Sequence, residues 1–557
     1  MPRRSPPRPV GRINTAASTT TSEQHTEQTP LLAGTPTPVS STARSSSPSP
    51  SRSSFTEDGG SGAGSDTLAP LRAALRPRVL LLSLALVFLL ELSIGMAVAP
   101  TNAIMEAIIC RQMHPEAFTP PSGGFLTGGL MRDVSRGRMV LSNDKVCQEP
   151  DVQGYLAVLR GWMATFECVP GIVGAVPFGV LSDRWGRRPV LGMSVGGLVA
   201  GTVFTYWVFY FSDLVPLWVS WFSAAFQLFG GGGAIVVAMF YTAIADVVPV
   251  EGRSTAFFQL GAAFLGSQMV AGPLGGAMLV WNPWVPLLAS LAILVITNLA
   301  VIIFPETVHV HDGSKAAEAE PDPESDADAN VSWLTKLWRK AGPGLAEVWD
   351  FVLGNTQLAF LMVSLVFVIL GRFVGELLLQ YARARYEWSW SKGSMVLTIR
   401  NAGSLATLLA LLPAAGAFCD RRLGMTGVEK DLWLARWSGV VHIVGSLIIA
   451  GAVNGALFSV GLAWFALGSG MSALIRSMLN ALVEEHHVGT VNSLIGFMEM
   501  VGMTMAGPLL AESLKAGLYL GGAWIGLPFV VATVLFVVST TILWTFRLPQ
   551  GASAVEI

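Results

Sequence analysis

The stretch GVLSDRWGRRPVL, residues 179–191, places four ionised side chains between two long apolar runs. A helix needs about 20 apolar residues to cross the hydrocarbon core of a bilayer, and both runs are long enough. One interpretation is that the charges only mark the boundary between two membrane helices. The other is that their types and spacing have a function of their own. The rest of the chain decides between these two interpretations.

The composition is that of an integral membrane protein. Of the 557 residues, 52% are hydrophobic and only 13% are charged, whereas soluble domains carry about 25% charged residues. The formal net charge of -2 leaves no basic excess, so we expect no nucleic-acid partner. The sequence contains no zinc-spaced cysteine and histidine set, no phosphate-binding loop and no nucleophile elbow. We therefore expect no enzyme activity, no metal and no cofactor.

About twelve apolar runs are long enough to span a bilayer. An acidic segment, AEAEPDPESDADAN, separates six of them from the other six. The predicted fold is therefore all-α, an integral membrane protein with twelve transmembrane helices in two pseudo-symmetric six-helix halves. The predicted parts are a disordered cytosolic tail at 1–75, a first half at 76–304, a cytosolic linker at 305–355, a second half at 356–547 and a cytosolic tail at 548–557.

Lysine and arginine in the short loops predict the orientation, because they concentrate on the cytosolic side of membranes. The arginines of the opening stretch fall on the same side as those before the first span, which we place at about 79–99. Both termini and the linker are therefore predicted to be cytosolic, and the loop 100–154 exoplasmic. Arg383, Arg385 and Lys392 violate this rule, so the orientation of the second half depends on the count of spans.

Four cysteines are too few for a disulfide scaffold. Two of them, Cys110 and Cys147, flank the polar part of the predicted exoplasmic loop. Disulfides persist in exoplasmic compartments. We therefore expect these two cysteines to pair if the loop is exoplasmic.

The N-terminal tail is rich in Ser, Thr, Pro and Arg, a composition that does not support a packed core. No apolar segment occurs before about residue 79, which argues against a cleavable secretory signal. Within the tail, EQTPLL places Glu27 four positions before the pair Leu31 and Leu32. This is the acidic dileucine pattern of sorting signals, although a chance match is equally compatible. The predicted membrane is the vacuolar or the plasma membrane.

The opening stretch falls in the predicted cytosolic loop between the second and third spans. It spells G-x-x-x-D-R-x-G-R-R through Gly179, Asp183, Arg184, Gly186, Arg187 and Arg188. With twelve spans and a central linker, this motif resembles the signature of the major facilitator superfamily of secondary transporters over about residues 79–546. The resemblance implies alternating access, in which one half rocks against the other around a midplane site.

The resemblance also implies that this loop latches the two halves together when the cytosolic side is closed. Gly179 lies one helical turn before Asp183 and lets a neighbouring helix approach closely. Asp183 then faces the positive end of a helix from the other half. Arg184 and Arg188 are expected to pair with acidic groups or lipid phosphates. We therefore expect the motif to control the conformational switch.

Several other resemblances are partial. GPLGG at 272–276 resembles the end of the antiporter motif of drug/proton exchangers, with Gln268 in place of a glycine, and close helix packing explains it equally well. QLFGGGGA resembles a proton-relay pattern with Gln227 in place of the arginine, and Gln227 is a cavity candidate. PET at 305–307 resembles a sugar-porter signature that is otherwise absent. A degraded copy of the opening motif at 416–422 supports an internal repeat.

Charged side chains inside the predicted spans are candidates for the central cavity. Each costs about 2.5–3.5 kcal/mol at the bilayer centre unless it faces a partner or water. Glu91, Glu167 and Glu499 lie near mid-membrane and are candidate proton-coupling carboxylates. Arg372 and Glu376 are one helical turn apart and are expected to pair, either as a structural salt bridge or as part of the cavity.

Other polar residues allow two interpretations each. Arg400 either holds an anionic substrate or extends toward the membrane surface. Extension to the surface is favoured for Arg476, and simple packing for His442. His486 and His487 lie beside two glutamates and suggest either metal ligands or a solvated turn, of which we favour the turn.

Segments at 106–111, 245–257 and 377–391 are similar to a group of filamentous-fungal members of the superfamily. Two functional classes follow. The first is a secondary active transporter of a small organic solute, coupled to protons. The second is a membrane sensor on the same fold that binds solute without transporting it. The carboxylates at mid-depth favour the transporter, and we expect a monomer whose partners are the bilayer, a small molecule and protons.

Overall fold

The computed structural model describes residues 65–115, 145–307, 356–425, 427–483 and 488–547. All of these residues belong to one compact unit. The predicted dileucine signal, the acidic linker, both histidines at 486–487 and the C-terminal tail lie outside the described residues.

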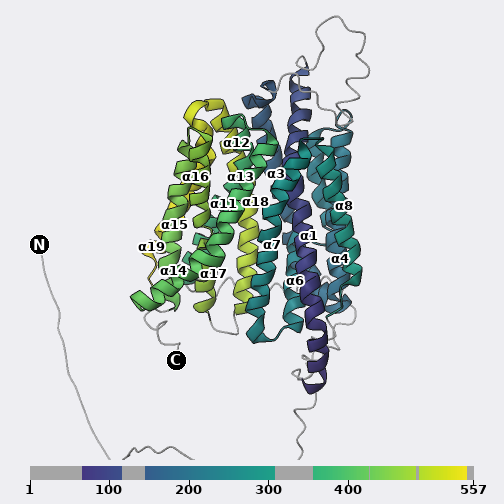
Figure 1. Cartoon of the computed structure of the whole chain (residues 1–557), viewed down its shortest axis with the longest axis vertical. Coiled ribbons are helices and arrows are strands. Elements are labelled where there is room, and N and C mark those ends of the chain that lie inside the picture. Colours follow the sequence, from purple (N-terminus) through teal and green to yellow (C-terminus); the bar gives the residue numbers. More distant parts are fainter. Residues whose placement is uncertain (1–64, 116–144, 308–355, 426, 484–487, 548–557) are drawn as a thin grey trace, which may run out of the picture. The chain divides into compact units, whose positions relative to one another are not determined.

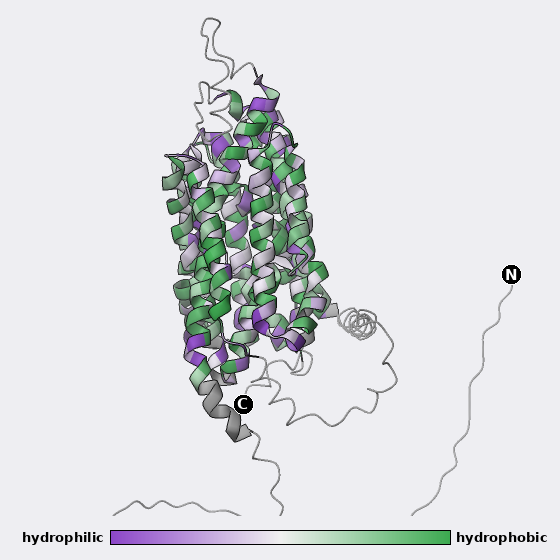
Figure 2. Ribbon diagram, turned by 90° about the vertical axis from the view of Figure 1, so that its right-hand side faces the viewer, coloured by the Kyte–Doolittle hydropathy of each residue, from purple (hydrophilic) through white to green (hydrophobic). Residues whose placement is uncertain are grey.

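The described residues form helices and no strands. Twelve helical segments are long and apolar enough to cross a membrane, and hydrophobic residues cover most of their length (Figure 2). These segments confirm the predicted fold class. The first half contains α1 (Ser65–Met113), α3 (Pro150–Trp185), α4 (Arg187–Tyr210), α5 (Ser223–Gln227), α6 (Gly232–Val247), α7 (Val250–Leu279) and α8 (Trp284–Ala300). The second half contains α11 (Thr356–Arg372), α12 (Leu378–Tyr386), α13 (Trp390–Ala406), α14 (Leu412–Phe418), α15 (Gly427–Gly451), α16 (Gly455–Leu467), α17 (Met471–Ala481), α18 (Val488–Leu520) and α19 (Leu527–Thr545).

The two halves meet along two seams, where α3 packs against α18 and α7 packs against α13 (Figure 1). Small residues make these seams close, as is usual between membrane helices. A Cβ added to Gly161 of α3 would come within 2.7 Å of the carbonyl oxygen of Gly507 of α18. On the other seam, Ser391 Oγ donates to the carbonyl oxygen of Gly276 at 2.7 Å.

The first helix is longer than predicted. The sequence analysis ends the first span near residue 99, whereas α1 continues to Met113. The extra turns are held by packing, because Ile104, Met105 and Ile109 are buried in an apolar cluster with residues of α3. Part of the predicted loop 100–154 is therefore helical.

The fourth apolar run of the sequence, at about 217–245, is long enough to predict one continuous helix, but the span is broken. It divides into a 3₁₀ segment, α5 and α6, and the four glycines at 230–233 lie at the break. Gly231 and Gly232 have φ values of 79° and 69°, which side chains other than glycine rarely adopt. The glycines therefore interrupt the helix as well as allowing close packing.

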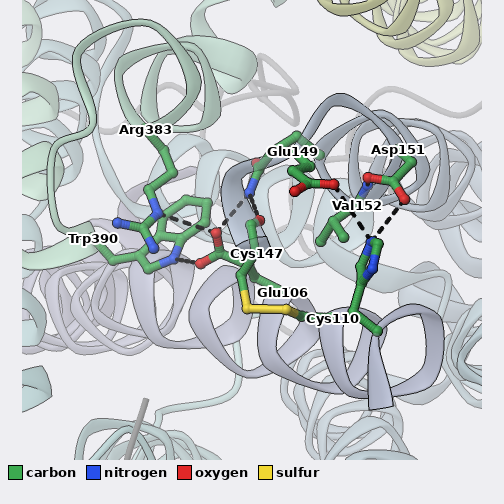
Figure 3. Close-up of a disulfide and its surroundings, with 10 residues drawn as sticks. Glu106, Cys110, Cys147, Glu149, Asp151, Val152, Arg383 and Trp390 are labelled. Carbon is green, nitrogen blue, oxygen red and sulfur yellow. Dashed lines mark hydrogen bonds and ion pairs between the residues drawn. A yellow bond between two sulfur atoms is a disulfide. The ribbon is translucent and has the colours of Figure 1, made fainter. Parts of the chain in front are cut away.

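Cys110 and Cys147 form a disulfide between the end of α1 and the residues before α3, which confirms the predicted pair (Figure 3). Both cysteines are buried. We call this end of the bundle the disulfide end. The opposite end, where residues 179–188 join α3 to α4, is the motif end.

Replacing Cys110 and Cys147 together with serine is expected to lower the melting temperature of the purified protein by several degrees. The bond closes a loop with a sequence separation of 37, for which the chain-entropy treatment gives about 3–4 kcal/mol. Intrinsic tryptophan fluorescence during heating measures the change. Cys168→Ser, which removes a free cysteine, is the matched control, and equal melting temperatures for the two variants would contradict the prediction.

Candidate functional site

The motif residues lie at the motif end, between α3 and α4, and Arg187 is their buried member. Its guanidinium donates to Ser182 Oγ at 2.6 Å, to Asp183 Oδ1 at 2.7 Å and to Asp246 Oδ2 at 3.3 Å. The side chains of Arg187 and Asp246 are only 5% and 4% exposed. Arg187 therefore ties α3, α4 and α6 together within the first half, a role that the motif alone does not predict.

Gly186 and Glu306 fix the start of α4. Gly186 has a φ of 111°, and a Cβ at this position would collide with the carboxylate of Glu306. Glu306 accepts from the backbone N–H groups of Arg187 at 2.8 Å and Arg188 at 3.2 Å. It thereby satisfies free donors at the positive end of the helix. In this chain the glutamate of the PET sequence caps a helix.

The predicted latch is not engaged in this conformation. Asp183 pairs with Arg187 of its own half, and the space around a Cβ of Gly179 is open. In the part of the chain that the structure describes, the side chains of Arg184 and Arg188 contact no acidic partner. The latch therefore stays a prediction for a state in which the motif end is closed.

A cavity of about 480 Å³ lies beside the motif, between α4 and α8. Its lining is mostly apolar, with Arg188 and Glu306 at one side. Two lining residues, Leu299 and Ile302, are highly exposed, as is normal for side chains that face lipid. This cavity therefore differs from the predicted central site between the halves.

A chain of polar groups connects the halves at mid-depth. Glu91 of α1 is 8% exposed and accepts from Gln268 Nε2 of α7 at 2.8 Å. The backbone carbonyl oxygen of Gln268 accepts from Asn401 Nδ2 of α13 at 3.5 Å, and Asn401 Oδ1 accepts from Arg400 Nε at 3.3 Å. Gln268 stands where the antiporter motif has a glycine. The residue that departs from the motif is therefore the one that links Glu91 to the second half. The sequence analysis did not assign a role to Asn401.

The GPLGG residues bring α7 close to both neighbours. Gly275 lies against the backbone of Met96 in α1, and Gly272 and Gly276 lie against Ser394 in α13. Close helix packing therefore explains these glycines structurally. These glycines therefore form part of the contact between the two halves.

Glu167 of α3 is an exposed carboxylate. Its electrostatic neighbours are Arg160 of its own helix and Glu376 of the second half. Among the described residues, Glu167 has no hydrogen-bond or ion-pair partner. Its place in a central cavity stays a prediction.

The predicted ion pair between Arg372 and Glu376 is not formed among the described residues in this conformation. The α-helix ends at Arg372, and residues Phe373–Leu377 continue as a 3₁₀ helix. Because a 3₁₀ helix has three residues per turn, residues four apart no longer share a face. Arg372 Nη1 donates instead to Ser472 Oγ of α17 at 2.6 Å.

Three other candidate residues contact neighbouring side chains or helices of their own half. Glu499 of α18 pairs with Arg476 of α17, with 3.0 Å between Oε1 and Nε, and the Arg476 side chain remains 44% exposed. His442 is buried and stacks on Phe536 with ring centroids 4.6 Å apart, as the packing interpretation predicted. Gln227 is 8% exposed and packs against glycines of α4, which makes it a packing residue of the first half.

A buried polar cluster joins the halves at the disulfide end (Figure 3). Glu106 Oε1 of α1 accepts from Arg383 Nε of α12 at 3.1 Å and from Gln153 Nε2 of α3 at 2.6 Å. Trp390 Nε1 of α13 donates to the other oxygen of Glu106. Gln380 Nε2 donates to the carbonyl oxygen of Gln153 at 2.8 Å. No sequence pattern predicts this cluster, although Arg383 is an exception to the loop-charge rule.

His114 lies near two carboxylates beside the disulfide. Its Nε2 atom is 2.9 Å from Asp151 Oδ2 and 3.8 Å from Glu149 Oε2. Both carboxylates stand at the start of α3, where they complement the positive end of the helix. Pairing and helix capping therefore explain this group.

Two six-helix halves that meet around charged side chains have the architecture of a membrane transporter. The family model of the Major Facilitator Superfamily matches residues 157–507. The efflux pump ustT of Aspergillus flavus is 31% identical over 79% of this chain and 82% of its own length. The chain therefore belongs to the major facilitator superfamily.

Other relatives and solved structures agree with this assignment. The MFS efflux pump atnC of Emericella nidulans is 28% identical, over 85% of this chain and 88% of its own. The xylose transporter XylE of E. coli superposes with a TM-score of 0.53 at 13% identity, over 84% of this chain and 97% of its own. The nucleoside transporter NupG superposes with a TM-score of 0.52 at 12% identity, over 84% and 100%. These matches place the chain among filamentous-fungal transporters of the superfamily, as multi-pass integral membrane proteins.

Proposed function

We propose that the protein exports a small organic solute and uses a proton gradient to do so. The relatives named as efflux pumps support export as the direction of transport. The polar chain from Glu91 through Gln268 to Asn401 is the observation that carries proton coupling. It connects a buried carboxyl group of the first half to a helix of the second half.

The coupling follows from the position of this carboxyl group. Carboxyl groups in membrane-spanning helices mark proton pathways when no cation neutralises them, and Glu91 has no ion-pair partner in the described part of the chain. Gain or loss of a proton at Glu91 changes which hydrogen bonds Gln268 makes. The backbone carbonyl of the same residue accepts from Asn401 across the seam, so a shift of Gln268 displaces this contact with the second half. Glu167 is a second candidate on the same interface.

The conformation supports alternating access with the disulfide end closed. Hydrogen bonds across the seams join the halves near the disulfide end, whereas Gly179 at the motif end faces open space. With the orientation predicted from the loop charges, the disulfide end is exoplasmic and this state is open toward the cytosol. Such a state accepts a cytosolic solute for export.

A non-transporting sensor is the alternative on this fold. The named relatives are transporters and efflux pumps, and none of them supports a sensor. A sensor also requires no carboxyl group that changes its protonation in each cycle. We therefore favour the exporter.

Glu91→Gln is expected to abolish solute-dependent proton movement in proteoliposomes while solute exchange across the membrane continues. The amide keeps a side chain of the same size but cannot carry a proton. Dissipation of a pH gradient is recorded while amino acids, sugars, organic acids and xenobiotics are added one at a time. Glu167→Gln is tested in parallel, because either carboxyl group is a candidate.

Glu512→Gln is the matched control, since Glu512 is exposed and contacts only Lys515 in the described residues. Unchanged proton movement in Glu91→Gln would remove Glu91 from the coupling step. Solute entry without proton movement in the wild type would contradict proton coupling altogether. If no solute of the panel moves, the sensor gains support.

A further inference from the structure

Two arginines of the second half lie close together inside the membrane-spanning region. Arg372 ends α11, and the guanidinium of Arg400 on α13 lies against Gly375. Because Gly375 follows Arg372 by three residues at the start of a 3₁₀ segment, the two positions share a face. Arg372 and Arg400 are also within electrostatic range of each other. Two positive charges thus face the same small region.

Neither arginine has a carboxylate of its own among the described residues. Arg372 donates to the hydroxyl of Ser472, and Arg400 donates to the amide oxygen of Asn401. The carboxylate within electrostatic range of Arg372 is Glu499, which Arg476 already binds. Glu499 is therefore neutralised by Arg476 rather than by Arg372 or Arg400.

The remaining titratable groups nearby are a histidine and two carboxylates. His442 lies within electrostatic range of Arg372 and is buried between aromatic rings of the second half. Glu376, on the same 3₁₀ segment, has Glu167 of the first half as its electrostatic neighbour, and among the described residues neither carboxylate bonds to Arg372 or Arg400. An arginine cannot lose its proton in a protein. A guanidinium without a bonded carboxylate inside a membrane protein therefore requires another anion or water.

Both arginines keep accessible surface. Arg372 is exposed and Arg400 is half-buried. The absence of a side chain at Gly375 leaves the guanidinium of Arg400 beside the backbone. Guanidinium groups bind carboxylate, sulfonate and phosphate oxygens through paired N–H donors.

We propose that Arg372 and Arg400 bind the anionic group of the transported solute, which makes the substrate an organic anion. The inference rests on the proposed function, because it names the substrate class of the same central site. The proposal assigns a different function to each half. The second half binds the anion, and the carboxyl groups of the first half carry the proton.

The test measures binding and does not require transport. The full-length protein is purified in low-salt buffer, and its melting temperature is recorded with 2-naphthoate, naphthalene-2-sulfonate and 2-naphthyl phosphate. The neutral 2-naphthamide and sodium chloride are added separately. A ligand that binds only the folded protein raises the melting temperature. We expect a rise of about 2 °C or more for at least one aromatic anion and none for the amide.

Arg372→Gln and Arg400→Gln are each expected to remove this rise, whereas Arg421→Gln, an exposed arginine at the motif end, keeps it. In low salt without ligand, Arg372→Gln is expected to melt at or above the wild-type temperature, because it relieves repulsion. A purely structural role for Arg372 predicts a lower melting temperature instead. No anion-dependent rise, or a rise that both variants keep, overturns the proposal.

An equal rise with chloride assigns the site to an inorganic counter-ion and also overturns the substrate class. Failure of the exporter model is distinguished by a different pattern. In that case the aromatic anions still bind through both arginines, but no solute moves in proteoliposomes.

Discussion

Arg383→Met is expected to destabilise the closed disulfide end by about 3–5 kcal/mol, the cost of leaving a buried charge without its partner. The side chains of Arg383 and Glu106 are only 4% and 5% exposed, with 3.1 Å between Nε and Oε1. Gln153 and Trp390 donate to the same carboxylate, and these donors cannot replace the lost positive charge.

The pair joins the two halves, so its loss acts mainly on the contact between them. Glu106 belongs to the first half, and Arg383 belongs to the second. The lost interaction therefore weakens the contact between the halves more than the fold of either half. At about 1.4 kcal/mol per factor of ten, the predicted loss shifts the balance between the two access states by roughly 10²–10³ or more. Transport is expected to fall, because the disulfide end no longer closes.

A double-mutant cycle isolates this interaction. Melting temperature and hydrogen exchange at the disulfide end are measured for Glu106→Gln, for Arg383→Met and for both changes together. The double variant is expected to lose less stability than the sum of the two single losses. Lys515→Met breaks an exposed pair with Glu512 on α18 and is expected to cost at most about 1 kcal/mol. Simple addition of the two losses would show that the pair does not hold this end closed.

The same pair shows where prediction from sequence ends. The twelve spans are continuous apolar runs, and the motif and the cysteines are short patterns, so each could be recognised in the linear sequence. Glu106 and Arg383 are 277 residues apart, and nothing local indicates that they meet. The one sequence feature that pointed to this pair was that Arg383 breaks the loop-charge rule. Arg383 is buried in an ion pair and Lys392 lies over the ring of Trp388, so neither is a free loop charge.

Local backbone geometry limited the other predictions. The pairing of Arg372 with Glu376 assumed α-helical spacing, and a 3₁₀ segment removes it. Gln268 was interpreted as a loss of the antiporter pattern, because one sequence does not show that its amide lies beside Glu91. The motif predicted a role for Asp183 between the halves, but the burial of Arg187 depends on Asp246, which comes from another helix. These contacts arise from packing rather than from spacing.

Arg187→Gln is expected to have the second large effect, a loss of about 3–5 kcal/mol in the stability of the first half. The change leaves Asp246, which is 4% exposed, without its guanidinium and removes the hydrogen bond to Ser182. The yield of folded protein and its melting temperature measure the loss. Arg184→Gln and Arg188→Gln are the controls in the same loop, because their side chains have no acidic partner in the described residues.

Asp183→Asn separates the two functions of the motif. The Asp183 side chain is 51% exposed, so its pair with Arg187 contributes at most about 1 kcal/mol, and the variant is expected to fold. If Asp183 also latches the halves when the motif end closes, transport falls in a protein of nearly normal stability. Unchanged transport in correctly inserted Asp183→Asn would leave the motif with only its structural role. The motif would then act through Arg187, the member that holds three helices of the first half together.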